Sequence, residues 1–314
     1  MTNPFHDEPR YLTELPEDLK RKRAAIARRR RWRRRLALGA LVAVVGAVVA
    51  LVVTGLGGGE GSKQAKPAAS QTGPQAANPD NTGTTFPAGW KPHPGPVPVL
   101  EYHAIQPPVP GAAEPQLFVP QADFEAQMGW LNDHGYEGVT LDQVEQAWYH
   151  NGELPPKPIV ISFDDGYLSQ YVAAFPALKR YQWPGVVNLI AQGSDLPNGD
   201  VKRMIGAGWE LGAHTITHVD LTTVDPATLQ REVAGSRQIL RQRFGTPVDN
   251  FAYPFGHYDN TVISAVRNAG YVGAQTEIPG VADAAHPYVI DRIEILLSDG
   301  LPGFISKLQS AGAG

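Results

Sequence analysis

The chain has 314 residues, no cysteine and a formal net charge of -4. This length allows one large or two small domains with a substantial buried core, and the lack of cysteine excludes disulfides, thiolate metal sites and thiol nucleophiles. The charge is unevenly spread: residues 1–35 carry 12 Lys and Arg against 5 Asp and Glu, whereas residues 36–314 carry 15 against 26. The two parts are therefore expected to face different surroundings.

An apolar run begins directly after the basic segment. No charged residue occurs from position 36 to position 59. Roughly 20 apolar residues are enough to cross a bilayer as a helix. Because 11 Lys and Arg closely precede this run, the positive-inside rule keeps residues 1–35 in the cytoplasm. We expect a single transmembrane helix over residues 36–56, in contact with the lipid bilayer, and an extracellular C-terminal part.

Two alternatives to this anchor stay open. A cleaved secretory signal uses the same ingredients, although its charged region is normally short and VVTGLGGG offers no clear cleavage site. A buried core helix is the other alternative. The arginine run is also what a phosphate backbone attracts. Beside an apolar span, topology and contact with anionic lipid headgroups explain it more simply, so we expect no nucleic-acid partner.

A polar segment separates the apolar run from the rest of the chain. Residues 57–96 are rich in Gly, Pro, Ser, Gln and Asn. Such a segment buries too little apolar surface to offset its ordering entropy, so we predict a disordered, partly stiff linker. The folded domain is predicted over residues 97–310. The sequence leaves its protein partners and oligomeric state open.

Within this domain, short apolar runs alternate with amphipathic segments. Helices are predicted over residues 121–134, 141–150, 171–181, 200–207, 226–244, 260–269 and 303–308. Strands are predicted at VPVLEYH, EGVTL, PIVISF, GVVNLI, ELGAH, NFAYPF, YVGAQT and YVIDRIEIL. Several strands are continuously apolar, as in parallel sheets covered on both faces. About seven repeats in this length favour a closed (β/α) barrel over an open sheet.

Polar clusters follow four of the predicted strands. Tyr102-His103 follows VPVL, Asp164-Asp165 follows IVISF, His214 follows ELGA, and the Tyr253–Gly256 segment follows NFA. In α/β folds, the loops at the carboxyl ends of the strands carry the chemistry. Four clusters on one rim predict a functional site there.

Asp164 and Asp165 are neighbouring carboxylates, which repel each other unless a cation compensates them. A bound metal would supply that cation. The alternative for the pair alone is structural, with Asp165 capping the next helix and Asp164 forming a turn with Gly166.

His214 and His218 are four positions apart, so their imidazoles share a face in either a helix or a strand. Two histidines, one carboxylate and an open position form the catalytic zinc pattern. A histidine pair without an acid is more often structural. With the strand-end aspartates, the pattern predicts one divalent metal ion bound by nitrogen and oxygen, with zinc suited to these ligands.

The motifs PVLEYHAI, ISFDDGY, GWELGAHTITH and FAYPFG, in this order and spacing, resemble the polysaccharide deacetylase family, carbohydrate esterase family four. The resemblance covers about residues 97 to 310. It implies a distorted (β/α)7 barrel and metal-dependent removal of N-acetyl groups from β-linked amino sugars.

Matched by position, this resemblance gives the clustered residues separate roles. It implies that Asp165, His214 and His218 bind the metal and that Asp164 is the general base. A metal would polarise the acetamide carbonyl and lower the pKa of a water, whose proton Asp164 would take. Phe255 matches the residue whose backbone N–H helps to bind the oxyanion, because the preceding proline cannot donate.

The sequence departs from the family pattern at two places. Ala252 stands where an arginine usually holds the base, and Arg292 in VIDRIEI is the nearest substitute, with an ordinary ion pair as its alternative. The late histidine that usually protonates the leaving amine is missing near Ser298. His103 resembles the first-strand histidine of the biofilm-polysaccharide branch and is the candidate acid, with a core histidine as its alternative.

Several other side chains are weaker candidates for the site. His257 and His286 lie on predicted loops, and Tyr167 and Tyr253 are candidates for stacking on sugar faces.

Taken together, the sequence predicts a membrane-anchored extracellular N-deacetylase. Its expected substrate is a polysaccharide containing N-acetylglucosamine, either poly-β-1,6-N-acetylglucosamine or peptidoglycan. Two alternatives stay open. One is a carbohydrate O-acetyl esterase on the same fold, since a less basic leaving group tolerates a missing acid. The other is a catalytically silent carbohydrate-binding module.

Overall fold

The computed structural model describes residues 87–313. The predicted cytoplasmic tail, the transmembrane helix over residues 36–56 and most of the linker lie outside the described residues. Within the described part of the chain, none of the helices combines the length and apolar character needed to span a bilayer.

A closed ring of parallel strands forms the centre of the domain. The strands follow the ring order β2, β12, β11, β10, β9, β8 and β7, and pairing of β2 with β7 closes it. An eighth strand, β5 (Glu137–Val139), pairs with the first half of β7. The predicted (β/α)7 barrel is thereby confirmed. The ring strands are β2 (Val99–Tyr102), β7 (Pro158–Phe163), β8 (Val186–Leu189), β9 (Glu210–Ala213), β10 (Asn250–Ala252), β11 (Gly273–Pro279) and β12 (Ile290–Glu294).

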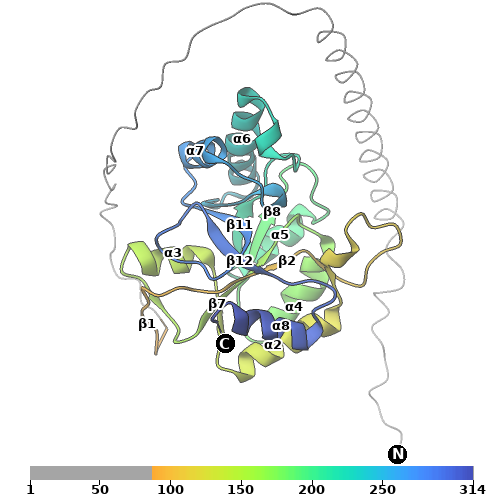
Figure 1. Ribbon diagram of the computed structural model, residues 1–314, viewed down its shortest axis with the longest axis vertical. Helices are drawn as coiled ribbons and strands as arrows, with labels where there is room; N and C mark the ends of the chain where they lie inside the picture. The colour runs from red at the N-terminus through yellow and green to blue at the C-terminus, as the bar shows by residue number, and fades with distance from the viewer. Residues whose placement is uncertain (1–86, 314) are drawn as a thin grey trace, which may run out of the picture. The chain divides into compact units, whose positions relative to one another are not determined.

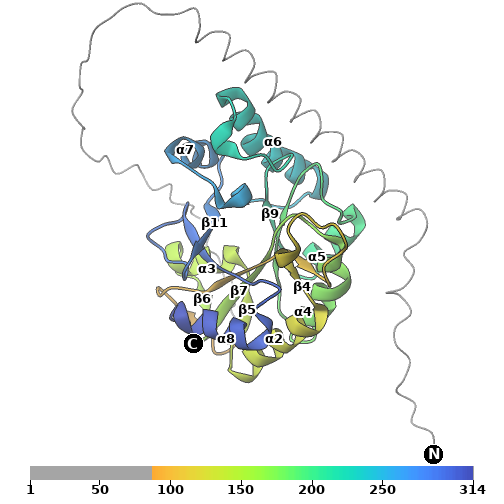
Figure 2. The ribbon, with the colours of Figure 1, turned by 45° about the vertical axis from the view of Figure 1, so that its right-hand side comes forward.

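Helices surround this ring, as the two views of the ribbon show (Figure 1 and Figure 2). Each helix predicted within residues 97–310 is present, with bounds that shift by a few residues. The segment predicted over residues 171–181 begins as a π-helical stretch, Gln170–Ala174, before α4 (Phe175–Lys179). The other helices are α2 (Gln121–Asp133), α3 (Leu141–Tyr149), α5 (Asn198–Gly206), α6 (Pro226–Phe244), α7 (Asn260–Asn268) and α8 (Gly300–Ser310).

Local sequence explains where the longest helix begins and ends. The Asp225 side chain accepts hydrogen bonds from the backbone N–H groups of Ala227 and Thr228, and Pro226 occupies the first helical position of α6. Gly245 ends the helix with φ +68°, a left-handed conformation that glycine adopts without a steric cost. These signals explain why the predicted bounds of α6 agree with the structure.

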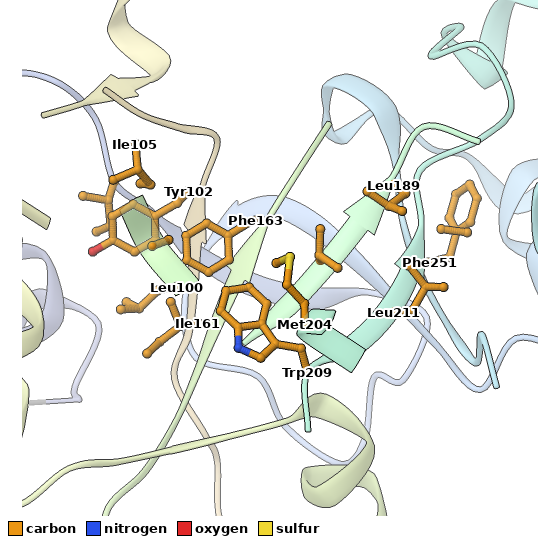
Figure 3. Packing of buried hydrophobic residues seen from close by; sticks show 14 of the residues in the cluster. Leu100, Tyr102, Ile105, Ile161, Phe163, Leu189, Met204, Trp209, Leu211 and Phe251 are labelled. Atoms are coloured by element: carbon orange, nitrogen blue, oxygen red, sulfur yellow. The ribbon is translucent and has the colours of Figure 1, made fainter. Parts of the chain in front are cut away.

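Side chains alternate along each strand between the helices and the barrel interior. On β7, Ile159, Ile161 and Phe163 pack in the large apolar core, whereas Val160 belongs to a second, smaller cluster. In the large core Phe163 stacks on Trp209, with ring centroids 5.4 Å apart (Figure 3). Because strands have a side-chain period of two, residues two apart on one strand share a face. Ser162 and Asp164 therefore follow Val160 toward the interior.

Three short pairings add to the ring, and two of them lie outside the predicted strands. β1 (Lys91–Pro92) pairs with β6 (Glu153–Leu154), and β3 (Ala104–Ile105) pairs with β4 (Phe118–Val119). Val97 forms an isolated bridge with Ala282. Segments this short carry no detectable alternation, which is why the sequence did not reveal them.

Candidate active site

The predicted rim residues converge at the carboxyl ends of the strands. Asp165 follows β7, and His214 and His218 follow β9. Asp165 Oδ1 lies 3.7 Å from His214 Nε2 and 3.5 Å from His218 Nε2, and the two Nε2 atoms are 3.0 Å apart. Ligand atoms about 2.0–2.1 Å from one tetrahedral zinc ion lie roughly 3.3 Å from each other. The three separations therefore fit a shared metal ion.

The protonation and bonding of these side chains also fit a metal. His214 Nδ1 donates to the backbone oxygen of Ala252 at 2.8 Å, which leaves the Nε2 lone pair directed at the cluster. Burial lowers the pKa of His214 to about 4, so the ring is neutral, as metal ligation requires. Asp165 Oδ1 is buried and has no hydrogen-bond partner among the described residues. A bound cation would give this oxygen the partner that a buried polar atom needs.

The loop that carries the two histidines is fixed by a helix behind it. The buried Glu232 of α6 accepts hydrogen bonds from the backbone N–H groups of Ile216 and Thr217 and from the Thr217 hydroxyl, at 2.9 to 3.0 Å. Thr215 and His218 adopt φ values of +63° and +59° in this loop. Such conformations persist only where the surroundings hold them, and they cluster at functional sites.

Asp164 lies beside the predicted metal cluster and is almost completely buried. Arg292 Nη1 donates to its Oδ1 at 3.0 Å, and Nη2 donates to its Oδ2 at 2.9 Å. Asn188 Nδ2 donates to the same Oδ1 at 2.7 Å. A bidentate guanidinium fixes the plane of a carboxylate as well as its position. Arg292 of β12, the residue predicted to substitute for the arginine missing at Ala252, thus contacts Asp164.

Arg292 is itself held from several directions. It is fully buried, and its Nε donates to the backbone oxygen of Thr276 at 2.7 Å. Its Nη1 also contacts the Ser162 hydroxyl, and its Nη2 lies 3.0 Å from Glu101 Oε1. Burial opposes ionisation of Asp164, but the positive charge of Arg292 holds the pKa of Asp164 well below its usual range. Asp164 is therefore a carboxylate at neutral pH.

His103 lies at the same end of the barrel. The residue is 7% exposed, and one polar atom each from His103, Glu101 and Asp164 lie within 4.8 Å of one another. His103 Nδ1 is buried without a hydrogen-bond partner among the described residues. The predicted acid is therefore close to the predicted base.

Phe255 borders the metal cluster on the solvent side. Its ring meets the His218 ring edge to face, with centroids 4.6 Å apart, and its side chain is 41% exposed. Its φ of +60° is unusual for a residue with a Cβ. The conformation turns the short segment after β10 toward the cluster.

The structure corrects one of the two predicted sugar contacts. Tyr253 is fully buried and its hydroxyl donates to the Tyr288 backbone oxygen at 3.1 Å, so the prediction that it lines a groove is wrong. Alternation along the strand turns it toward the helices rather than the rim. Tyr167 is half-buried, with its ring 6.0 Å from that of Phe118, and its sugar contact stays a prediction.

The two weaker histidine candidates lie against other acids. His257 Nδ1 is 2.8 Å from Asp220 Oδ2, and His286 Nδ1 is 2.9 Å from Asp283 Oδ1. Both pairs lie on exposed loops. These contacts account for the two histidines without a role at the metal cluster.

Sequence reasoning missed several residues that support the site. Three of them, Glu101, Asn188 and Gln275, are polar side chains inside predicted strands, and that feature is the signal that could have found them. Gln170 Nε2 donates to the backbone oxygens of His103 and Asp164, and Gln275 exchanges hydrogen bonds with Asn188. A buried polar group is stable only with partners, so it indicates a local network. The residues missed are Glu101, Gln170, Asn188, Glu232 and Gln275.

Comparison with known proteins agrees with this geometry. A family model described as polysaccharide deacetylase matches residues 151–274. YxkH of Bacillus subtilis, which is named for the polysaccharide deacetylases, is 30% identical over 215 residues, covering 67% of this chain and 74% of YxkH. The chain belongs to the polysaccharide deacetylase family. Members of this family are hydrolases, and the predicted resemblance is confirmed.

Two further relatives describe the extent of the match. The poly-β-1,6-N-acetyl-D-glucosamine N-deacetylase of Escherichia coli is 26% identical over 229 residues, and the match covers 58% of this chain and 34% of that enzyme. The chain thus matches about a third of the length of the E. coli protein. The structure of the Streptococcus pyogenes deacetylase PplD in complex with acetate superimposes with a TM-score of 0.63 at 27% identity, covering 68% of this chain and 99% of PplD.

Proposed function

We propose that the chain is a metal-dependent N-deacetylase of an extracellular polysaccharide that contains N-acetylglucosamine. One observation carries this proposal. The ligand atoms of Asp165, His214 and His218 converge within 3.7 Å, and Asp164 is held beside them as an ionised carboxylate by Arg292. A metal-ligating triad with an adjacent oriented base is the arrangement that hydrolysis of an unactivated amide requires.

The clustered residues have separate roles in the proposed hydrolysis. Asp165, His214 and His218 would hold a divalent metal, which would act as a Lewis acid on the acetamide carbonyl and would lower the pKa of a water. Asp164 takes the proton of the attacking water. Arg292 and Asn188 keep its carboxylate plane fixed, so the base needs no reorganisation when the reaction starts.

Two further residues act on the substrate. The Phe255 backbone N–H lies in the segment that borders the metal cluster, and it is suited to donate to the carbonyl oxygen as negative charge develops there. His103 protonates the leaving nitrogen. An amine is too basic to leave as an anion, so an acid close to the base favours amide over ester hydrolysis.

The name of the E. coli relative supports poly-β-1,6-N-acetylglucosamine as the substrate, with peptidoglycan as the second polymer to test. Acetate release by the full chain should be measured on both polymers and on an O-acetylated polysaccharide. The proposal predicts acetate from an N-acetylated polymer, and a loss of this activity in His103→Ala. Turnover of the O-acetyl ester alone would instead identify an esterase, and metal binding without acetate release would identify a silent binding module.

We also propose that this reaction occurs outside the cell membrane. The support is the uncharged run over residues 36–56 behind a basic segment. Protease added to intact cells should remove the folded domain and leave a short membrane-bound fragment. Protection of the domain until the cells are lysed would contradict this location.

A further inference from the structure

Glu101 is a fully buried carboxyl group that the mechanism above does not use. It lies on β2, two positions before His103, and its side chain is 0% exposed. Because side chains two positions apart on a strand share a face, Glu101 and His103 both point into the barrel. Burying a carboxyl group is costly unless the surroundings compensate it, so its presence calls for a physical reason.

The guanidinium of Arg292 does not fully compensate the burial of the Glu101 carboxyl group. Arg292 Nη2 lies 3.0 Å from Glu101 Oε1, but the guanidinium directs its hydrogen bonds to Thr276, Ser162 and Asp164. Among the described residues, neither carboxyl oxygen of Glu101 has a hydrogen-bond partner. Asp164 therefore has the well-directed bonds, and Glu101 has only an ion-pair contact.

A second orphaned atom lies next to this carboxyl group. His103 Nδ1 is also buried without a hydrogen-bond partner among the described residues, and polar atoms of Glu101, His103 and Asp164 lie within 4.8 Å of one another. A hydrogen bond between Glu101 and Nδ1, closed by a small rotation of either side chain, would give both groups a partner. The same bond would leave His103 Nε2 free to face the substrate.

The charges around Glu101 favour a proton in this contact. Burial raises the pKa of Glu101 well above its usual range, Arg292 opposes that rise, and the negative charges of Asp164, Glu277 and Glu294 add to it. A carboxyl group in these surroundings keeps its proton, which it can share with His103 Nδ1.

We propose that Glu101 is the positioning residue of the general acid: its carboxyl group binds His103 Nδ1 and directs the Nε2–H at the leaving nitrogen. The inference rests on the proposed function and deepens it. Arg292 would then link the two halves of the reaction, since it contacts Asp164 on one side and Glu101 on the other.

The protons balance when Glu101 and His103 are counted as a pair. Before the step the pair holds two protons, one between Glu101 and Nδ1 and one on Nε2. As the carbon–nitrogen bond breaks, its electron pair stays on nitrogen, which takes the Nε2 proton. The pair then holds one proton, and Asp164 holds the proton taken from water. Asp164 then loses its proton to solvent. The Glu101–His103 pair takes up a proton, which restores the starting state.

The test compares two leaving groups in the full chain. An N-acetylated glucosamine polymer needs a protonated leaving nitrogen, whereas an aryl acetate ester does not, because a phenolate is a weak base. Glu101→Gln should lower kcat for the amide by roughly 10- to 100-fold, a loss of the size seen when the hydrogen-bond partner of a metal-ligating histidine is removed. Turnover of the aryl acetate should stay within about threefold. Equal losses on both substrates would overturn the proposal, because they would mean that Glu101 acts through Arg292 and the base.

A double-mutant cycle tests the partner of Glu101 directly. In a His103→Ala background, Glu101→Gln should cause no further loss of amide turnover, because the residue that it positions is gone. Independent, multiplicative losses would contradict the proposal. Asp291→Asn is the control: it removes a half-buried carboxyl group from β12, the strand that carries Arg292, and it should leave both activities unchanged.

A Glu101→Gln variant that does not fold and an unaltered chain without amide turnover are distinguished as follows. If Glu101→Gln loses its cooperative melting transition, Glu101→Asp keeps the carboxyl group but withdraws it from His103, and it should show the same selective loss of amide turnover. Retention of full amide turnover by a folded Glu101→Asp and by Glu101→Gln would overturn the proposal. Absence of amide turnover in the unaltered chain would overturn the proposed function, and this inference with it.

Discussion

Both ends of the barrel interior contain buried acids, but only one end supplies them with a strong cation. At the carboxyl end, Arg292 lies between Asp164 and Glu101. At the opposite end, an acidic cluster gathers around Asn250. Asn250 Nδ2 lies 3.0 to 3.3 Å from carboxyl oxygens of all three acids in the cluster, which are Asp142, Glu145 and Glu210.

The acidic cluster has no cationic partner among the described residues, because none of its members forms an ion pair there. Burial raises the pKa of Glu145 to about 8 and that of Asp142 to about 6. The negative charge of Asp142 adds to the shift of Glu145, and the negative charge of Asp249 adds to that of Asp142. Glu145 and Glu210, whose pKa burial also raises well above its usual range, therefore remain largely protonated near neutral pH, whereas Asp164 is ionised. The comparison teaches that a buried carboxyl group becomes a base only where a cation stabilises its charge.

Removing the base should have the largest effect on activity. Asp164→Asn keeps the size of the side chain but cannot accept the proton of water, so kcat for acetate release should fall by about 10²- to 10⁴-fold. The matched control is Asp142→Asn at the opposite end of the barrel, which should keep kcat near that of the unaltered chain. Equal losses of kcat in Asp164→Asn and Asp142→Asn would contradict the proposed difference between the two ends of the barrel.

Removing the cation should have the largest effect on stability. Arg292→Met leaves Asp164 and Glu101 buried without their partner, which should lower the free energy of unfolding by about 3–5 kcal/mol. Arg203→Met removes an exposed pair with Asp200 and should cost less than about 1 kcal/mol. Urea unfolding of the three proteins measures both effects. A similar small cost for the two variants would show that Arg292 does not compensate the buried acids.

The acidic cluster should make stability depend on pH. The pKa of Glu145 is near 4.5 in the unfolded chain and about 8 in the folded one, so the folded state binds more protons between these values. The free energy of unfolding should therefore fall as pH rises from about 4.5 to about 8, by on the order of 1 kcal/mol per pH unit. Glu145→Gln should flatten this slope in urea unfolding at several pH values. An unchanged slope would mean that Glu145 is not protonated in the folded chain.

The smallest effect is expected at the corrected residue Tyr253. Tyr253→Phe removes a buried hydrogen bond to the Tyr288 backbone oxygen, which should cost about 1 kcal/mol of unfolding free energy. Because the ring is buried away from the rim, KM for the polymer should not change. A marked rise in KM would restore Tyr253 as a sugar contact.

Much of the fold follows from local sequence patterns. The continuous apolar run of β7 identified a strand covered on both faces, and the Asp225-Pro226 start and Gly245 end of α6 fixed that helix. The rim position of Asp164 and Asp165 followed from the same strand, because side chains after parallel strands meet at one edge. These features depend on neighbouring residues only.

Features that depend on distant contacts could not be derived in the same way. Glu101 and Arg292 lie far apart in the sequence, at opposite ends of the folded domain's chain. Their contact exists only because β2 and β12 are adjacent in the ring. Arg292 was a candidate from the sequence, but its simultaneous contact with two carboxyl groups was not. Tyr253 was misassigned because a strand-end position does not reveal which face the side chain takes.

The central claim is that a metal bound by Asp165, His214 and His218 works with Asp164 to release acetate. The most direct measurement is acetate release from an N-acetylated glucosamine polymer by the full chain after chelation and after titration with zinc. The account predicts that chelation abolishes release and that about one equivalent of zinc per chain restores it in the unaltered protein but not in Asp164→Asn. Undiminished release by the chelated protein, or full restoration in Asp164→Asn, would contradict it.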